Sequence, residues 1–156
     1  MKNKQIFTLL LVMAFLFITG QSFAQSPCSG FETCSSLNYK HFHESGYSRS
    51  GQFNNGTTSV FRVTVFSGLD YHFAMCYEKE LGEVQLKIMV DNNEKTVLYD
   101  NLLDNYEKEI VISMVTSQTL LVEVSAPGDL NEIKADSPKY CLGLLVEYRT
   151  TPKSGF

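Results

Sequence analysis

The stretch EVQLKIMVDNNEKTVLYDN, residues 83–101, decides the fold of this chain. Successive side chains on a β-strand point to opposite faces, so apolar residues at every second position predict a half-buried strand. Turn-forming residues follow at 91–94, and an extended pattern resumes at Thr96. The stretch therefore predicts a β-hairpin, with four aliphatic side chains on one face of its first strand: Val84, Leu86, Ile88 and Val90.

The same alternation recurs before and after this hairpin. Its regular spacing is typical of an antiparallel β-sandwich, and we expect an all-β, jelly-roll-like fold of about seven to eight strands. One apolar face per strand fits two sheets packed face to face. The last expected strand, around 139–149, is apolar on both faces for much of its length, which predicts a central position in its sheet.

The first 24 residues have the features of a cleavable signal peptide. Lys2 and Lys4 precede an apolar run over 6–18, and Ser22-Phe23-Ala24 matches a small-x-small cleavage site. The run is shorter than the roughly 20 residues of a membrane-spanning helix. We therefore expect an exported protein, periplasmic or secreted, with no membrane span after cleavage. A polar N-terminal arm is expected at 25–58, a β-sandwich domain at 59–149 and a flexible tail at 150–156.

The charge of the chain limits its partners. The formal net charge is −4, and two of the basic residues lie in the expected signal peptide. A protein of this sign lacks the basic patch by which proteins bind nucleic acid or anionic membranes. We therefore expect no nucleic-acid partner.

Four cysteines, Cys28, Cys34, Cys76 and Cys141, follow the expected signal peptide. In an exported protein an even number of cysteines favours disulfide bonds, and four cysteines allow three connectivities. The preferred pairing is a local Cys28–Cys34 bond together with a Cys76–Cys141 bond between two expected strands. Buried free thiols at Cys76 and Cys141 are the alternative.

Three histidines are the main candidates for chemistry. In an extended segment His41 and His43 point the same way, so both imidazoles could reach one metal ion. A third ligand would have to be His72. This arrangement gives the alternative interpretation of a small hydrolase or metal-dependent enzyme. Ser48 offers less, because its surroundings miss the G-x-S-x-G pattern by one position and lack the strand-to-helix turn that the motif needs.

Acidic loops raise the question of calcium, which binds six to eight oxygen ligands. No spacing matches a defined calcium loop, and ordinary turn chemistry explains Asp and Asn there equally well. We therefore predict no metal and no other cofactor. The three groups are Asp91, Asn92, Asn93 and Glu94; Asp100, Asn101, Asp104 and Asn105; and Asp129, Glu132 and Asp136.

Aromatic residues supply the candidate binding surface. Tyr and Phe combine a large apolar area with a defined shape, and aromatic residues are enriched at interfaces. The residues of the polar arm are the freer to be exposed, and they are Tyr39, Phe42, Tyr47 and Phe53. Four other tyrosines fall at positions that point to the inner face of the expected strands, and we assign them to the core: Tyr71, Tyr77, Tyr140 and Tyr148.

The order of motifs resembles known families. F-x-V-x-V-x-x-G-x-x-Y-x-F at 61–73 is followed by LYDN at 98–101, TLLVEV at 119–124 and YCLGLLVEY at 140–148. This order resembles the bacterial pre-peptidase C-terminal type of β-sandwich, an accessory domain of exported enzymes. It is more similar to a group of small secreted proteins from Bacteroidota of unassigned function. The resemblance covers residues 59–148, and it implies fold and compartment but transfers no catalytic residue. The chain departs from the pre-peptidase type in one respect: we expect no attached enzyme, so any partner would have to bind in trans.

Together these observations predict a non-enzymatic, exported β-sandwich that binds a protein or glycan at the cell envelope or outside the cell. The enzyme using His41, His43 and His72 is one alternative, and a structural component of the envelope is another. The oligomeric state stays open.

Overall fold

A computed structural model describes residues 27–33, 36–37, 40–128 and 137–152. These residues form nine β-strands and three short 3-10 helices, so the expected all-β fold is confirmed. No helix in this part of the chain is both long and apolar enough to cross a membrane. The expected signal peptide lies outside the described residues.

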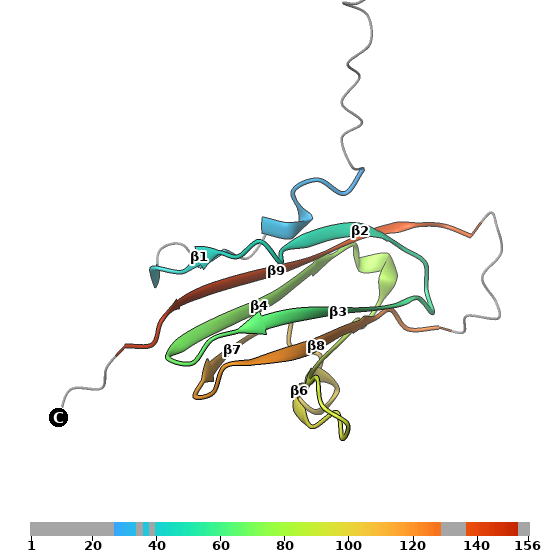
Figure 1. Cartoon of the computed structure of the whole chain (residues 1–156). Helices are drawn as coiled ribbons and strands as arrows, with labels where there is room; N and C mark the ends of the chain where they lie inside the picture. Colours follow the sequence, from blue (N-terminus) through green and yellow to red (C-terminus); the bar gives the residue numbers. More distant parts are fainter. Residues whose placement is uncertain (1–26, 34–35, 38–39, 129–136, 153–156) are drawn as a thin grey trace, which may run out of the picture.

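The strands form two antiparallel sheets, seen as two layers in Figure 1. The β9 sheet has the order β1-β9-β4-β7, with β2 also paired to β9, and the β8 sheet has the order β3-β8-β5-β6. The strands of the β9 sheet are β1 (His43–Glu44), β2 (Arg49–Phe53), β4 (Leu69–Tyr77), β7 (Glu109–Met114) and β9 (Tyr140–Thr150). The other strands and the helices are β3 (Thr58–Val65), β5 (Gln85–Val90), β6 (Val97–Asp100), β8 (Gln118–Ser125), η1 (Phe31–Thr33), η3 (Lys79–Leu81) and η4 (Asn101–Leu103).

The predicted hairpin is confirmed, since β5 pairs with β6 in antiparallel orientation. The inner faces of the two sheets supply the core, and burial of each large aliphatic side chain there stabilises the fold by about 1.5–3 kcal/mol. The core alternates along each strand as the sequence predicts. Its fully buried members include Val63, Val65, Phe73, Leu86, Ile88, Leu120, Val122 and Val146.

The prediction that the last strand is central is also confirmed. β9 has β1 and β2 on one side and β4 on the other. Both β1 and β2 lie within residues 25–58, the segment expected to be a polar arm. They raise the number of strands above the seven to eight expected.

The outer face of the β9 sheet is covered by the N-terminal segment, whose described residues are 27–33, 36–37 and 40–42. In Figure 1 this segment, with η1, lies over β2 and β9. Gly143 on β9 makes the crossing possible. A Cβ atom there would clash with the backbone of Phe31 and lie 2.7 Å from the backbone nitrogen of Glu32.

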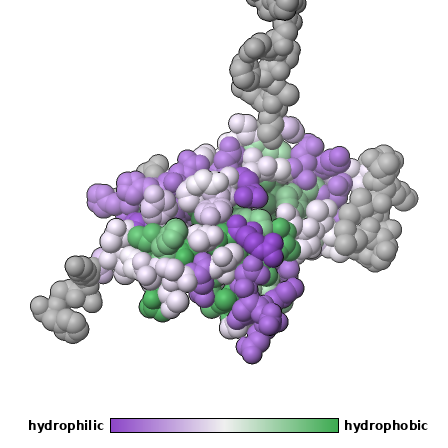
Figure 2. Space-filling model, viewed as in Figure 1, coloured by the Kyte–Doolittle hydropathy of each residue, from purple (hydrophilic) through white to green (hydrophobic). Residues whose placement is uncertain are grey.

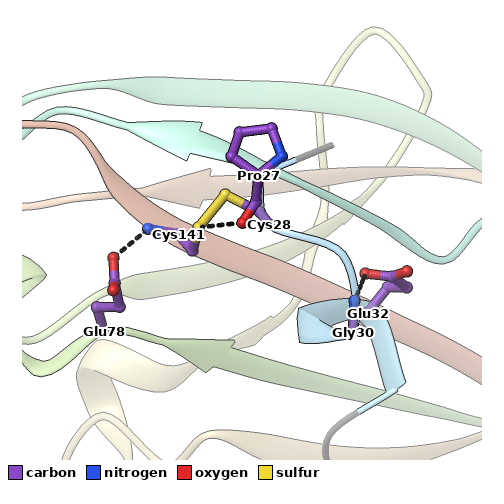
Figure 3. The surroundings of a disulfide bond; sticks show 6 residues. All are labelled: Pro27, Cys28, Gly30, Glu32, Glu78 and Cys141. Atoms are coloured by element: carbon purple, nitrogen blue, oxygen red, sulfur yellow. Dashed lines mark hydrogen bonds between the residues drawn. A yellow bond between two sulfur atoms is a disulfide. The ribbon is translucent and has the colours of Figure 1, made fainter. Parts of the chain in front are cut away.

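A disulfide between Cys28 and Cys141 fixes this segment to β9, with the two Cα atoms 5.2 Å apart (Figure 3). The preferred pairing of Cys28 with Cys34, and of Cys76 with Cys141, is therefore wrong. Cys76 is disulfide-bonded as well, and Cys34 lies outside the described residues. Strand spacing could not predict this pairing, because the N-terminal segment carries no period that reveals its path across the sheet.

Candidate functional site

An open pocket of about 330 Å³ lies at one end of the sandwich. It lies between the turn that follows β1 and the turn that joins β3 to β4. Four of its lining residues are aromatic. The lining residues are Glu44, Ser45, Gly46, Tyr47, Thr64, Phe66, Leu69, Tyr71 and Tyr148.

Strand register brings the tyrosines of this pocket together. Tyr71 on β4 is the direct partner of Tyr148 on β9, and their ring centroids are 6.2 Å apart. Both occupy positions whose side chains point to the inner face of the β9 sheet. Tyr148 lies near the end of its strand, where the opposite sheet no longer covers it. Its side chain is therefore 37% exposed, whereas Tyr71 is buried.

Phe66 is held in place by its backbone while its ring stays exposed. The Phe66 N–H donates to the Tyr71 hydroxyl at 3.1 Å, and the next N–H, of Ser67, donates to Ser117 Oγ at 3.0 Å. Burial raises the pKa of Tyr71, so its hydroxyl remains neutral. The Phe66 side chain is 57% exposed. The turn thus presents a fixed, solvent-facing aromatic ring at the pocket.

A smaller pocket of about 190 Å³ lies farther along β3, between β2 and β3. Its lining includes Phe53, Phe61 and Arg49, whose guanidinium lies 4.4 Å from the Phe61 ring centroid. Arg49 makes no salt bridge with any described residue. We call the line of the two pockets, between β1 and β2 of one sheet and β3 of the other, the β2–β3 seam. Figure 2 shows hydrophobic surface along the middle of the molecule, with most of the hydrophilic residues around it.

A buried polar cluster lies elsewhere, on the outer face of the β9 sheet. Glu147 accepts hydrogen bonds from the Ser36 hydroxyl and from the Leu37 N–H, the latter at 2.9 Å. Its Oε2 also lies 3.1 Å from Nδ1 of His72. Both Glu147 and His72 are fully buried. Burial raises the pKa of Glu147, but the bonds from Leu37, Ser36 and His72 outweigh it and hold that pKa below its ordinary value.

The order of groups in this cluster does not suit a serine hydrolase. A serine nucleophile needs a histidine as its direct base, with the carboxylate behind that histidine. Here the carboxylate of Glu147 stands between Ser36 and His72. The cluster instead ties the N-terminal segment to β9.

The three histidines proposed for the enzyme alternative do not converge. His43 on β1 pairs with Tyr148, whereas His72 on β4 pairs with Glu147. Adjacent residues of a strand face opposite sides of a sheet, so His43 and His72 lie on opposite faces. His41 is exposed. Within the described parts of the chain, no group of three His, Cys, Asp or Glu residues is placed to hold a metal ion.

The acidic loops have structural partners. Asp91 forms a salt bridge of 2.7 Å with Arg62. Asn101 is buried and bonds three backbone groups, those of Leu86, Val84 and Glu107. The third predicted group, at 129–136, lies outside the described residues. The first two groups thus stabilise turns.

The four aromatics of the predicted binding surface are divided. Tyr47 lines the larger pocket and Phe53 the smaller one. Phe42 is only 2% exposed and packs edge-on against His72 at 5.8 Å, which corrects its placement on an exposed surface. Tyr39 lies outside the described residues.

Sequence reasoning missed Phe66 and assigned Tyr148 to the core. The signal for Phe66 is a large aromatic residue directly before the turn at 67–70, where a strand can no longer bury it. The signal for Tyr148 is its place near the last inward-facing position of a long strand.

Comparisons with known proteins give likenesses among solved structures. No family model matches the chain, and no curated protein matches it. The resemblance to pre-peptidase C-terminal domains and to the Bacteroidota proteins therefore stays a prediction. Among solved structures, the chain is similar to Aeromonas hydrophila PliG, a periplasmic lysozyme inhibitor of g-type lysozyme. The TM-score is 0.48 at 11% identity, and the match covers 70% of this chain and 90% of that chain.

Proposed function

We propose that this chain is a non-enzymatic, exported binding domain that recognises a partner protein in trans through the larger pocket of the β2–β3 seam. The observation that carries the proposal is the solvent-facing aromatic lining of that pocket, with Phe66 57% and Tyr148 37% exposed. Aromatic residues are enriched at protein interfaces, and a few of them supply most of the binding energy.

Export is supported by the disulfide chemistry. Disulfides persist in oxidising compartments such as the periplasm and the extracellular space. The Cys28–Cys141 bond agrees with the signal-peptide features of the first 24 residues. The partner is therefore to be sought in the cell envelope or outside the cell.

The polar groups of the pocket favour a protein over a glycan. A sugar ring presents many hydroxyls, which need directional hydrogen-bond partners. In the larger pocket the Ser45 hydroxyl already donates to the Val146 carbonyl at 2.6 Å, and the Tyr71 hydroxyl already accepts from Phe66. The remaining lining is mostly apolar and suits an apolar side chain of a protein.

The test is affinity capture with residues 25–156, immobilised, from envelope and culture-medium fractions of the cells that make the protein. A double variant, Phe66→Ala with Tyr148→Ala, removes the exposed rings. We expect at least one envelope or extracellular protein to be enriched by the natural sequence and lost with this variant, with a decrease in binding of about 2 kcal/mol or more.

The matched control is Leu103→Ala, which removes a side chain that is 87% exposed on η4, away from the seam. Capture should survive this change. Equal capture by the double variant would contradict the proposal. Binding on a glycan array that depends on Phe66 and Tyr148 would favour the glycan alternative, and turnover of any substrate by the purified protein would favour an enzyme.

A further inference from the structure

We infer that the partner docks as an extended polypeptide segment that adds a fifth strand to the β8 sheet along the free edge of β3. Side chains of that segment enter the two pockets of the β2–β3 seam. This inference rests on the proposed function and specifies the form in which the partner binds.

The outer edge of β3 has no strand partner in the described part of the chain. β3 pairs with β8 over all eight of its residues, and among the described residues no other strand pairs with it. The Ala126 N–H donates to the Thr57 carbonyl at 2.9 Å, so the backbone groups of Thr57 face β8. In an antiparallel pair these directions alternate from one residue to the next. Four residues of β3 therefore direct their N–H and C=O groups to the open edge: Thr58, Val60, Arg62 and Thr64.

This edge lacks the usual protection against strand pairing. Natural sheets blunt exposed edges with proline, bulges, very short strands or charged side chains. β3 has no proline and pairs with β8 in unbroken register, and Val60 on it is 51% exposed. Its single charged side chain, Arg62, is bound to Asp91, which follows β5 on the far side of β8. The guanidinium is thus drawn across the sheet and away from the edge.

The two pockets lie along the same strand. The smaller one is lined by Ser59 and Phe61, and the larger one by Thr64 and Phe66. Ser59 and Thr64 are five positions apart, as are Phe61 and Phe66, and this separation is about 17 Å along a strand. Because this separation is odd, the two side chains that an extended segment places in the pockets point to opposite faces of that segment. Strand addition of this kind draws affinity from backbone hydrogen bonds and specificity from pockets for alternate side chains.

Charge indicates the composition of the segment. Arg49 borders the smaller pocket, stacks on Phe61 and makes no salt bridge with any described residue. Arginine in this setting pairs well with a carboxylate, which it can bind through two parallel hydrogen bonds. The segment that fits therefore combines two apolar side chains with an acidic residue at the Arg49 end.

The experiment uses residues 25–156 and peptides selected on this protein from a phage-displayed random library, then synthesised as nine-residue probes. Arg62→Pro removes an outward-facing N–H and blocks pairing at the edge, a change that edge strands tolerate. Arg62→Ala removes the same side chain but keeps the N–H. Val111→Pro makes the matched change on the outer edge of β7, in the other sheet, where the alternation set by Lys108 and Met114 directs the Val111 N–H outward.

We expect the selected peptides to carry two apolar residues about five positions apart, together with an acidic residue. Their affinity should fall at least tenfold with Arg62→Pro and less than threefold with Arg62→Ala or Val111→Pro. Hydrogen exchange at the amides of Val60, Arg62 and Thr64 should slow in the complex. This readout needs no variant, so it stands even if Arg62→Pro does not fold.

The failures of the two proposals are distinguishable. Peptides that lose affinity with Phe66→Ala and Tyr148→Ala, but bind Arg62→Pro normally and leave the three amides unprotected, would overturn strand addition and leave the proposed function intact. Peptides that depend on neither change, or a library that yields no binder, would overturn both. A dimer of the purified protein that Arg62→Pro dissociates would identify the occupant as a second copy of this chain and overturn the proposal of a foreign segment.

Discussion

Two regions of this molecule gather aromatic and polar side chains, and they do so in opposite ways. On the outer face of the β9 sheet, the groups that suggest chemistry are buried and bonded to one another, as His72 and Glu147 are. Along the β2–β3 seam, aromatic rings are open to solvent, as Phe66 is. The first region fixes the N-terminal segment, and the second is left free.

This difference separates residues that stabilise the fold from residues that are available to bind a partner. A buried polar cluster is costly to break, because removing one partner leaves a buried polar group without its hydrogen bond. An exposed ring contributes little to folding, and exposed rings that gather in one patch mark an interaction site. Changes in the covered face should therefore lower stability, and changes in the seam should lower binding alone.

The largest effect should come from removing the Cys28–Cys141 disulfide. These residues are 113 positions apart, and a loop of roughly this length stabilises a protein by about 4.7 kcal/mol in the chain-entropy treatment. We expect the paired variant Cys28→Ser, Cys141→Ser to lose about 4–5 kcal/mol in guanidinium unfolding. A loss below about 1 kcal/mol would mean that the N-terminal segment is held on the sheet by its other contacts.

A smaller but still clear effect should follow from Gly143→Ala. The new methyl group meets the backbone of Phe31 and Glu32, which cannot move aside as a flexible side chain can. Overpacking of this kind costs about 1–3 kcal/mol, and we expect a value near the upper end in urea unfolding. Gly51→Ala on β2 is the matched control, since nothing lies within 4 Å of its Cβ position. Equal stability of the two variants would contradict the close crossing.

Acid should weaken the covered face through Glu147. The pKa of this carboxyl is held below its ordinary value of 4.5, so its contribution to stability is present at neutral pH and is lost as the pH falls through the folded-state pKa. We expect Glu147→Gln to cost about 2 kcal/mol at pH 7. The gap between the two proteins should narrow in urea unfolding as the pH is lowered below about 4.5.

The pKa of Asp70 is also lowered, but this does not affect the comparison between the natural sequence and Glu147→Gln. Burial raises the pKa of Asp70, and bonds from Ser113, Thr151 and Arg149 lower it further than burial raises it. Both proteins retain Asp70, so its contribution cancels in the difference. Glu80→Gln, which removes an exposed carboxylate on η3, is the control and should leave the pH profile unchanged. A constant gap between the natural sequence and Glu147→Gln at every pH would show that the charge of Glu147 does not hold the segment.

The smallest effect on stability should come from the seam. Phe66→Ser removes a ring that is 57% exposed, while the backbone bond from residue 66 to the Tyr71 hydroxyl remains. We expect the free energy of unfolding to change by about 0.5 kcal/mol or less, measured in urea. A loss above about 1.5 kcal/mol would place Phe66 in the packing of the fold and remove the contrast between the two regions.

The sequence predicted most of the fold, because the signal for strands is local. The period of two from Val84 to Val90 is present whether or not the strand has found its partner. The last strand is apolar on both faces, and this pattern predicted its central position. In the structure both faces of β9 are covered. The same signal could not reveal what covers the outer face, because the N-terminal segment has no period and lies on the sheet through single contacts.

The candidate site was predicted only in part. Tyr47 and Phe53 line the seam as the sequence suggested, but Phe42 from the same polar segment is buried against His72. Residue type and neighbours are similar in the three cases. Only the path of the segment, over the sheet at Phe42 and along its edge at Tyr47, separates them.

The sequence by itself determined the alternation along the strands and the core they bury, because each depends on residues close together in the chain. It also determined the acidic charge and the capacity for disulfide bonds, because these depend on composition. Tertiary structure decided that Cys28 meets Cys141 and that His43 and His72 face opposite sides of a sheet. It also decided that the outer edge of β3, beside two pockets, has no strand partner in the described part of the chain. These depend on which distant strands become neighbours. That choice is made by the packing of whole faces, which no short stretch of sequence encodes.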